Sequence, residues 1–260
     1  MTTPKISICI PAYEMHGKGA LFLAESLRRI RTQTYQNYEV VISDNSTTEM
    51  IFDVYQTFKD LINIKYIKHN GSKTMSPNTN NAIKYSNGDL IKILFLDDFF
   101  ADDNALHLLL RAYFEAKRPW IISGCTHSID GQHFFNSMIP YYNDKIFLGN
   151  NTISSPSVIM FERQSEVLFD DELTWLMDCD FYKRMHDCFG PPGTCAEVTV
   201  VNRLGAHQVS NAGVNRSRKI RELKYVMKKH AASVNLWDRL LLVRHWISTK
   251  QLRMLTRYFI

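Results

Sequence analysis

Acidic side chains stand at two places in this sequence where they could do chemistry. Asp97 and Asp98 directly follow the apolar run IKILFL, and Asp178 and Asp180 lie together in WLMDCDFYKRM. Carboxylate oxygens bind hard divalent cations such as Mg²⁺ and Mn²⁺, and a carboxylate can also take a proton from an attacking hydroxyl group. Metal binding and general base catalysis are therefore the two kinds of chemistry to consider.

The same acids also have a structural interpretation, because Asp favours the first turn of a helix. A second acidic pair, Asp102-Asp103, directly precedes the helical run NALHLLLRAYFEA, so we expect that pair to cap a helix. For Asp97-Asp98, metal binding and a helix start both stay open at this point. Asp178 and Asp180 are two residues apart and would point to different faces of a helix, which leaves one for chemistry and one for structure.

The elements that must position these acids alternate between strand and helix periods over about the first 100 residues. Strands are predicted at 5–13, 38–44, 62–69 and 89–96, and helices at 19–33, 48–61 and 76–86. Such alternation predicts a mostly parallel, three-layer α/β sheet, in which ligands bind beyond the carboxyl ends of the strands. The polar residues at those ends are Tyr13, Glu14, Asp44, Asn45, Ser46, His69, Asn70, Asp97 and Asp98.

The second half of the chain has a looser pattern. A further strand is predicted at 119–127 and a helix at 176–190, with aromatic-rich strands and loops between them. Exposed aromatic rings beside a cleft can hold sugar rings, although packing is the more common role. The residues to which both interpretations apply are Phe134, Phe135, Tyr141, Tyr142 and Trp175.

Composition and cysteine spacing exclude several classes of protein. The chain has 260 residues of which 45% are apolar, which is enough for a substantial core, and no apolar stretch approaches the roughly 20 residues that cross a bilayer. Five cysteines form no CxxC pair, and the first residues show no secretory signal, so we expect reduced thiols and a cytoplasmic protein. Dinucleotide-binding glycine motifs, P-loops and zinc spacings do not occur in the sequence.

Charge is distributed unevenly along the chain. Residues 211–260 contain twelve Lys/Arg and two acids, a net charge of +10, which leaves −5 for the rest. We therefore expect a body over residues 1–212 and a basic helical extension over residues 213–260. The extension either lies on an anionic membrane surface or packs on the body or a second subunit, and nucleic-acid binding is disfavoured.

Four segments of the sequence together resemble the family-two glycosyltransferases, which have the GT-A fold. They are ISICIPAYE, YEVVISDNSTTE, NNAIKYSNGDLIKILFLDD and WLMDCDFYKRM, and the resemblance covers roughly residues 5 to 210. It implies a Rossmann-like α/β/α sandwich with a nucleotide-binding half over residues 1–100 and an acceptor half over residues 101–212. It also implies an inverting enzyme that moves a sugar from a nucleotide sugar, with UDP as the expected nucleotide, to a hydroxyl group.

On the donor side, the resemblance implies that Asp44 accepts a hydrogen bond from the uracil ring. The family commonly has Asp-Asp-Gly where this chain has Asp44-Asn45-Ser46. An Asx cap for the helix after Thr48 is the alternative role of Asp44. The residues that we expect around the donor are Pro11, Ala12, Tyr13, Glu14, Asp44, Asn45, Asn80 and Asp97.

At the diphosphate, the family has an Asp-x-Asp motif. In this chain Phe95 stands at the position of the first Asp of that motif. Asp97 is then the expected ligand of Mn²⁺ or Mg²⁺, with Asp98 as a second ligand or an orienting partner and His207 as a third metal or phosphate contact. The metal would neutralise the charge that develops on the departing nucleoside diphosphate. For Asp97-Asp98 the resemblance thus favours metal and diphosphate binding over a helix start.

On the acceptor side, the family places its catalytic base at the start of a helix. Asp178 matches that position, with Asp180 as the alternative base and Arg184 as the basic residue one turn later. The expected acceptor is a glycan or a lipid-linked sugar in polysaccharide biosynthesis, at the periphery of a membrane. Phe95 motivates an alternative function, a non-catalytic nucleotide-sugar or carbohydrate-binding protein of the same fold.

Overall fold

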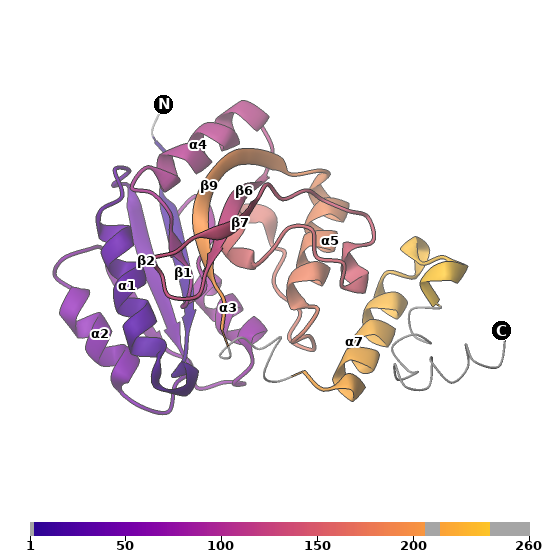
Figure 1. The fold of residues 1–260 in the computed structure, drawn as a ribbon, viewed down its shortest axis with the longest axis horizontal. Helices are drawn as coiled ribbons and strands as arrows, with labels where there is room; N and C mark the ends of the chain where they lie inside the picture. The colour runs from indigo at the N-terminus through magenta and orange to yellow at the C-terminus, as the bar shows by residue number, and fades with distance from the viewer. Residues whose placement is uncertain (1–2, 206–213, 240–260) are drawn as a thin grey trace.

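One nine-stranded sheet runs through the part of the chain that this computed structural model describes, residues 3–205 and 214–239 (Figure 1). Its strand order is β3-β2-β1-β4-β8-β6-β9-β5, and β7 pairs with β6. The strands are β1 (Ile6–Ala12), β2 (Tyr38–Asp44), β3 (Ile64–Lys68), β4 (Leu90–Ile93), β5 (Phe99–Phe100), β6 (Trp120–Ser128), β7 (Phe135–Met138), β8 (Ile159–Glu162) and β9 (Gly193–Arg203).

The first four strands form the parallel part of the sheet, as the alternation of strand and helix predicts. β1 pairs in parallel with β2 and with β4, and β2 pairs in parallel with β3. β8 then joins β4 in antiparallel orientation and connects this part to β6 and β9. The prediction of the first half is confirmed, whereas β9 has no counterpart among the predicted elements.

Helices cover both faces of the sheet. They are α1 (Gly19–Arg31), α2 (Met50–Phe58), α3 (Met75–Lys84), α4 (Ala105–Ala116), α5 (Met177–Phe189) and α7 (Arg216–Lys229). Short 3₁₀ turns lie at η1 (Met15–Gly17), η2 (Ile146–Leu148), η3 (Pro156–Val158), η4 (Arg163–Ser165) and η5 (Ala231–Ser233). The helices α1, α2 and α4 share one apolar core with the sheet, and α3, α5 and α7 share the other.

The alternation of side chains along β1 separates the two cores. Ile6, Ile8 and Ile10 are fully buried on the side of α1, and Cys9 is fully buried on the other side together with Ile91 and other residues of β4. Successive side chains of a strand point to opposite faces, and a parallel strand covered on both faces is apolar almost throughout. The predicted three-layer α/β/α architecture is confirmed.

Among the described α-helices only α7 begins with a capping side chain of its own, and α4 and α5 show what replaces one. No side chain caps the start of α4 or of α5 from the adjoining sequence. At α4, the side-chain oxygen of Gln33 accepts a hydrogen bond from the Leu106 N–H at 3.1 Å. Asp102 accepts from the N–H of Asn104 just before the helix, so the prediction that the second acidic pair caps α4 is wrong.

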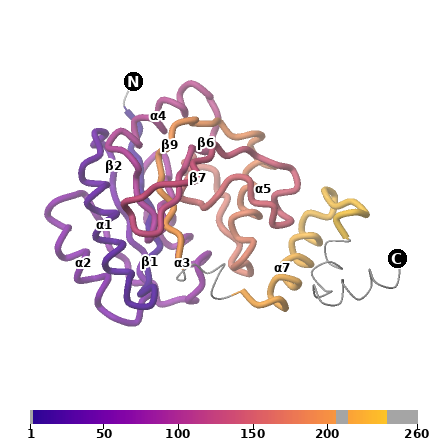
Figure 2. Tube along the Cα trace, in the orientation of Figure 1, coloured from indigo at the N-terminus to yellow at the C-terminus, as the bar shows by residue number. Residues whose placement is uncertain are grey.

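The helix α7 lies beside α5, on the side of the molecule away from α1 and α2 (Figure 2). Its Leu223 and Val226 side chains are fully buried in the core that contains α5. Residues 216–229 therefore pack on the body, as one of the two alternatives predicts, and contact of the extension with a membrane stays a prediction. The predicted boundary near residue 212 and residues 240–260 of the basic extension lie outside the described residues. None of the described helices is both long and apolar enough to cross a bilayer.

Candidate active site

A cavity of about 510 Å³ brings together the strand ends of the parallel sheet and the start of α5. Asp97, Asp98 and Asp178 line it, together with Tyr13 from the end of β1. The other lining residues are Met15, Met75, Phe95, His127, Met138, Gly149, Asn151, Ser154, Ser155, Pro156, Thr174, Trp175, Leu176, Met177, Cys179, Asn202 and Leu204. Residues that are 80 positions apart in sequence thus share one wall, as expected at the carboxyl edge of a parallel sheet.

Asp97 and Asp98 lie on a tight turn that follows β4. The strand ends at Ile93, earlier than predicted, and the N–H of Asp98 donates to the carbonyl of Phe95 at 2.9 Å. The N–H of Phe95 in turn donates to the hydroxyl of Ser157 at 2.8 Å. The turn therefore has backbone support from both directions, which fixes the position of the two acids.

Asp98 is almost fully buried and accepts three hydrogen bonds. One oxygen accepts from the Arg203 N–H at 3.0 Å, and the other accepts from the amide of Asn202 at 2.9 Å and the hydroxyl of Ser155 at 3.0 Å. Burial, together with the charge of Asp97, raises the pKa of Asp98 to about 7. A carboxylate that is occupied in this way suits an orienting partner better than a metal ligand.

Arg203 holds the same turn from the end of β9. Its guanidinium donates to the carbonyl of Asp97 at 3.2 Å and pairs with Glu25 of α1 at 2.5 Å. The guanidinium also lies over the ring of Phe22, 4.7 Å from its centroid. Arg203 and Asn202 were not predicted from the sequence. The signal that could have indicated them is CAEVTVVNR, a β-rich run that ends in these two polar residues.

Asp178 is the second residue of α5 and is partly buried at the cavity. Its Oδ2 accepts a hydrogen bond from the amide of Asn151 at 2.7 Å, and its Oδ1 accepts from the N–H of Cys179 at 2.8 Å. Burial raises the pKa of Asp178 to about 6. This carboxyl group is thus ionised at neutral pH and basic enough to accept a proton, which is what a general base requires.

Asp180 is on the opposite side of α5 and is not among the residues that line the cavity. It is fully buried and binds Arg184 at 2.7 Å, Lys229 at 2.9 Å and His230 at 2.8 Å. Burial alone would raise its pKa, but these partners lower it to about 2. Asp180 therefore joins α5 to α7 and has the structural role that the spacing left for one of the two acids. Arg184, the matching basic residue, serves the same cluster.

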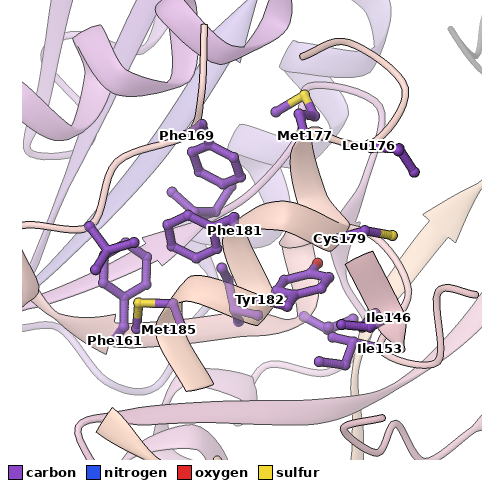
Figure 3. Close-up of a cluster of buried hydrophobic side chains, with 14 of the residues drawn as sticks. Ile146, Ile153, Phe161, Phe169, Leu176, Met177, Cys179, Phe181, Tyr182 and Met185 are labelled. Atoms are coloured by element: carbon purple, nitrogen blue, oxygen red, sulfur yellow. The ribbon is translucent and has the colours of Figure 1, made fainter. Parts of the chain in front are cut away.

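Aromatic packing fixes the position of α5 (Figure 3). Phe181 stacks on Phe169 with ring centroids 4.2 Å apart and packs against Phe161 of β8. The hydroxyl of Tyr182 donates to the carbonyl of Ser154 at 3.0 Å, which connects the helix to the cavity wall. These buried side chains lie on the face of α5 that points away from solvent, and they hold the helix that carries Asp178 in place.

At the end of β1, the expected donor residues have different surroundings. Tyr13 lines the cavity, whereas Pro11 and Ala12 are buried within β1. The carbonyl of Ala12 accepts from the N–H of Asn45 at 3.1 Å. Glu14 accepts from the hydroxyl of Thr47 at 2.5 Å. Glu14 and Asn45 thus hold the loop after β2 against the end of β1.

Asp44 is fully buried and has several intramolecular partners. Its Oδ2 accepts from the hydroxyl of Tyr66 at 2.6 Å and from Lys68 at 3.0 Å, and its Oδ1 accepts from the N–H of Ser46 at 2.8 Å. The last contact is an Asx turn, in line with the structural alternative. Asp44 is not among the residues that line the cavity, so its contact with uracil stays a prediction.

Asn80 lies on α3 and binds the backbone of the segment before α5. Its side-chain amide donates to the carbonyl of Phe169 at 2.8 Å, and its oxygen accepts from the N–H of the same residue at 2.8 Å. These two bonds fasten α3 to the segment before α5, and the predicted contact of Asn80 with the donor stays without geometric support. His207, the predicted third metal or phosphate contact, lies outside the described residues.

The aromatic candidates also differ from one another. Trp175 lines the cavity and packs on Gly149, whose φ of +92° favours glycine and where a Cβ would lie 3.2 Å from the indole. Tyr142 stacks on His186 with ring centroids 3.8 Å apart, which is a packing role. Phe134 and Tyr141 are exposed, and neither lines the cavity.

The acids at the cavity fit a cation that is shared with a substrate diphosphate. No group of three His, Cys, Asp or Glu residues within 3–205 and 214–239 could enclose a metal ion. Mg²⁺ and similar ions are commonly bound through one or two carboxylates together with substrate phosphates and water. Asp97, with Asp98 fixed behind it, matches that donor set, and Mn²⁺ takes the same oxygen ligands.

Comparison with known sequences identifies a family. The family model of glycosyl transferase family 2 matches residues 7–182. The Escherichia coli UDP-Glc:alpha-D-GlcNAc-diphosphoundecaprenol beta-1,3-glucosyltransferase WfaP is 28% identical over 156 residues, which are 60% of this chain and 53% of that protein. The GalNAc(5)-diNAcBac-PP-undecaprenol beta-1,3-glucosyltransferase of Campylobacter jejuni is 28% identical over 105 residues, 40% of this chain and 31% of that protein. The chain thus matches about half or less of the length of these relatives.

Solved structures show the same fold. Staphylococcus aureus TarS 1–349 in complex with UDP-GlcNAc has a TM-score of 0.64 at 17% identity and covers 93% of this chain and 79% of its own. The mannosyltransferase PcManGT of Pyrobaculum calidifontis, in complex with GDP-Man and Mn²⁺, has a TM-score of 0.59 at 15% identity and covers 94% and 80%. With the family match over residues 7–182, these likenesses confirm the GT-A fold, and the chain belongs to glycosyl transferase family 2.

Proposed function

We propose that this chain is an inverting glycosyltransferase that moves a sugar from a nucleoside-diphosphate sugar, UDP-linked, to an acceptor hydroxyl group. The observation that carries the proposal is the cavity that contains Asp97, Asp98 and Asp178 together. A group that can bind a diphosphate-bound cation and a group that can accept a proton thereby lie in one site. An in-line displacement at an anomeric carbon needs both.

Asp178 is the proposed general base. Its oxygens lie at the cavity, and the amide of Asn151 holds one of them at 2.7 Å. With a pKa near 6 it is mostly ionised at pH 7 and can accept the proton of the acceptor hydroxyl group as that group attacks. Asp180 does not lie at the cavity, and its pairing with three basic side chains lowers its basicity.

Asp97 is the proposed protein ligand of a divalent cation, either Mn²⁺ or Mg²⁺. When bound, such an ion supplies charge neutralisation to the leaving diphosphate. Asp98 orients the turn through Ser155, Asn202 and the Arg203 backbone. His207 is retained as a proposed phosphate or metal contact, and the presence of Mn²⁺ in the PcManGT structure supports a metal in this fold.

The donor and acceptor classes follow from the names of the relatives. WfaP is named for UDP-Glc, and both curated relatives are named for acceptors on diphosphoundecaprenol or PP-undecaprenol. We propose a UDP-sugar donor and a lipid-linked glycan acceptor, hence a role in polysaccharide biosynthesis at the cytoplasmic side of a membrane. On the donor side, Asp44 and Asn45 are the proposed base contacts, next to Pro11 and Ala12. The basic extension over residues 213–260 would contribute to membrane contact.

The test is a transfer assay on the purified full chain. Release of UDP from a panel of UDP-sugars is measured with a synthetic undecaprenyl-diphosphate-linked acceptor, with and without Mn²⁺. We expect acceptor-dependent release for the wild type and a drop of at least about 100-fold for Asp97→Ala, since loss of electrostatic stabilisation at a leaving group commonly costs that much. Asp103→Ala is the matched control and should retain wild-type turnover, because the Asp103 carboxylate accepts a hydrogen bond from the hydroxyl of Thr32, directly after α1.

A second candidate function rests on Phe95, which stands where the family has its first acid. A protein of this kind would bind nucleotide sugars without transferring them. Calorimetry with UDP, with and without Mn²⁺, separates the two candidates when it is combined with the transfer assay. Metal-dependent UDP binding without turnover on any donor in the panel would replace the proposed enzyme by this binding protein.

A further inference from the structure

The start of α5 is held by a residue from another helix. Glu222 of α7 is 1% exposed, and its Oε2 accepts hydrogen bonds from the N–H groups of Trp175 at 2.8 Å and Leu176 at 3.0 Å. Leu176 is the N-cap residue of α5, and no side chain of the adjoining sequence caps that end. The hydrogen-bond acceptor for the two N–H groups that precede α5 is therefore Glu222, which lies 47 residues after Trp175 and 46 residues after Leu176.

This arrangement replaces a local motif that the sequence lacks. In a capping box, a Glu or Gln three residues into the helix accepts a hydrogen bond from the N–H of the N-cap residue. In α5 that position is Cys179, whose side chain cannot do so. Glu222 takes over this function, and Asp178, the proposed base, lies only two residues beyond the N–H group that Glu222 binds.

Other contacts of α7 fix Glu222 in place. Lys219, one turn earlier, lies over the Trp175 ring with its Nζ 5.1 Å from the centroid. Lys229, two turns later, binds Asp170 at 2.5 Å and Asp180 at 2.9 Å. Leu223, next to Glu222, is fully buried in the shared core. The carboxylate of Glu222 is thus presented to α5 by a helix that is anchored on both sides of it.

Burying a carboxylate is costly, and Glu222 recovers only part of that cost. Its second oxygen, Oε1, is buried and has no hydrogen-bond partner among the described residues. An apolar side chain at this position would avoid the cost of removing a carboxylate from water, which is offset only where the buried acid has hydrogen-bond partners. For Glu222, the two hydrogen bonds from the backbone at the start of α5 offset that cost.

We propose that Glu222 is a positioning residue for the transfer reaction: from α7 it holds the first turn of α5 and thereby the carboxylate of Asp178. The proposal rests on the function proposed above, in which Asp178 is the base. It makes α7 part of the catalytic apparatus, although α7 contributes none of the residues that line the cavity. Without Glu222 the first turn of α5 would relax, and a small displacement of a base is enough to slow a reaction considerably.

The test compares Glu222→Ala, Glu222→Gln and Val226→Ala in the full chain. We expect Glu222→Ala to lower kcat by about 10- to 100-fold, with KM for the UDP-sugar within about twofold of the wild type. Glu222→Gln keeps an oxygen that can accept both N–H groups, so its kcat should stay within about threefold. Val226→Ala removes two methyl groups of α7 from the shared core without changing a polar contact of Glu222 or of α5, and it serves as the control for a general loss of packing.

Hydrogen exchange at the Trp175 and Leu176 amides provides a readout that does not need turnover. We expect faster exchange in Glu222→Ala than in Val226→Ala, and Glu222→Asp, with a shorter side chain, replaces the alanine variant if that variant does not fold. An unchanged kcat in Glu222→Ala, or equal losses in Glu222→Ala and Val226→Ala, would overturn the proposal. An inactive wild type would instead count against the proposed function, and the exchange rates would still decide whether Glu222 holds α5.

Discussion

Asp178 and Asp180 lie two residues apart on α5, and their surroundings differ in almost every respect. Asp178 is at the cavity with a neutral amide as its side-chain partner, whereas Asp180 is fully buried among Arg184, Lys229 and His230. The pKa is raised to about 6 in the first and lowered to about 2 in the second. Two positions along one helix, about half a turn, thus separate a side chain whose charge is disfavoured from one whose charge is well compensated.

This difference shows how the same residue type acquires two functions. Neutral partners leave a carboxylate basic, and basic side chains make it inert toward protons but effective in joining elements. The direction of each side chain on the helix decides which partners it meets, since residues two apart do not share a face. The following predictions test that comparison, beginning with the largest expected effect.

Asp178→Asn should lower the rate of sugar transfer by about 1,000-fold, because removal of a general base commonly costs between two and four orders of magnitude. The measurement is kcat with the UDP-sugar and acceptor that the wild type uses. Affinity for UDP, measured by calorimetry, should stay within about twofold. Turnover near the wild-type level would mean that Asp178 is not the base and that the comparison with Asp180 has no catalytic meaning.

Asp180→Asn should instead lower the free energy of unfolding, by about 2 kcal/mol, because it removes the buried carboxylate that Arg184, Lys229 and His230 share and whose pKa those partners lower from 3.8 to about 2. Urea titration at pH 7.5 measures this loss. The contribution of a carboxylate with a lowered pKa is complete above its unfolded value near 3.8 and is lost as the pH falls toward about 2. Wild type and variant should therefore become equally stable in that acidic window.

The pH dependence of transfer gives a third test. If Asp178 acts in its ionised form, kcat/KM should rise with pH and level off above its pKa of about 6. Between pH 7.5 and pH 5 we expect about a tenfold loss, which corresponds to one pH unit below that value. A profile that stays flat down to pH 5 would assign the proton transfer to a group with a lower pKa.

Local patterns in the sequence were enough to predict the parallel part of the fold and to draw attention to one acidic pair. The strand and helix periods over residues 5–96 predicted the parallel sheet, and the end of its fourth strand indicated Asp97 and Asp98, which line the cavity. Asp178, which lines the same cavity, was indicated by the family resemblance. These features depend on neighbours within one or two turns of chain, so a single sequence contains them.

The contacts that tune the site could not be predicted, because their partners are distant in sequence. Gln33 caps α4 from the loop after α1, and Glu222 caps α5 from α7. Asn202 and Arg203 reach Asp98 from the end of β9, more than 100 residues away. Nothing in the residues adjoining Asp98 or Leu176 indicates these partners, which only the packing of the elements brings near.

The smallest expected effect concerns stability: replacing Asp178 and replacing Asp180 should change the free energy of unfolding in opposite directions. Because burial raises the pKa of Asp178 from 3.8 to about 6, its ionised form is less favourable in the folded protein than in the unfolded chain. This cost is present in full above pH 6 and disappears as the pH falls to about 4. Asp178→Asn removes the charge, so at pH 7.5 we expect the free energy of unfolding to rise.

The increase should be about 1 kcal/mol, since solvent at the cavity screens part of the cost and the amide keeps only one of the two oxygens that accept from Asn151 and Cys179. Urea titrations at pH 7.5 and pH 4 measure it, with Asp180→Asn as the control of opposite sign. A gain at pH 7.5 that vanishes at pH 4 would show that the protein sacrifices stability to keep Asp178 basic. A loss at pH 7.5 would mean that its hydrogen bonds outweigh the burial of its charge.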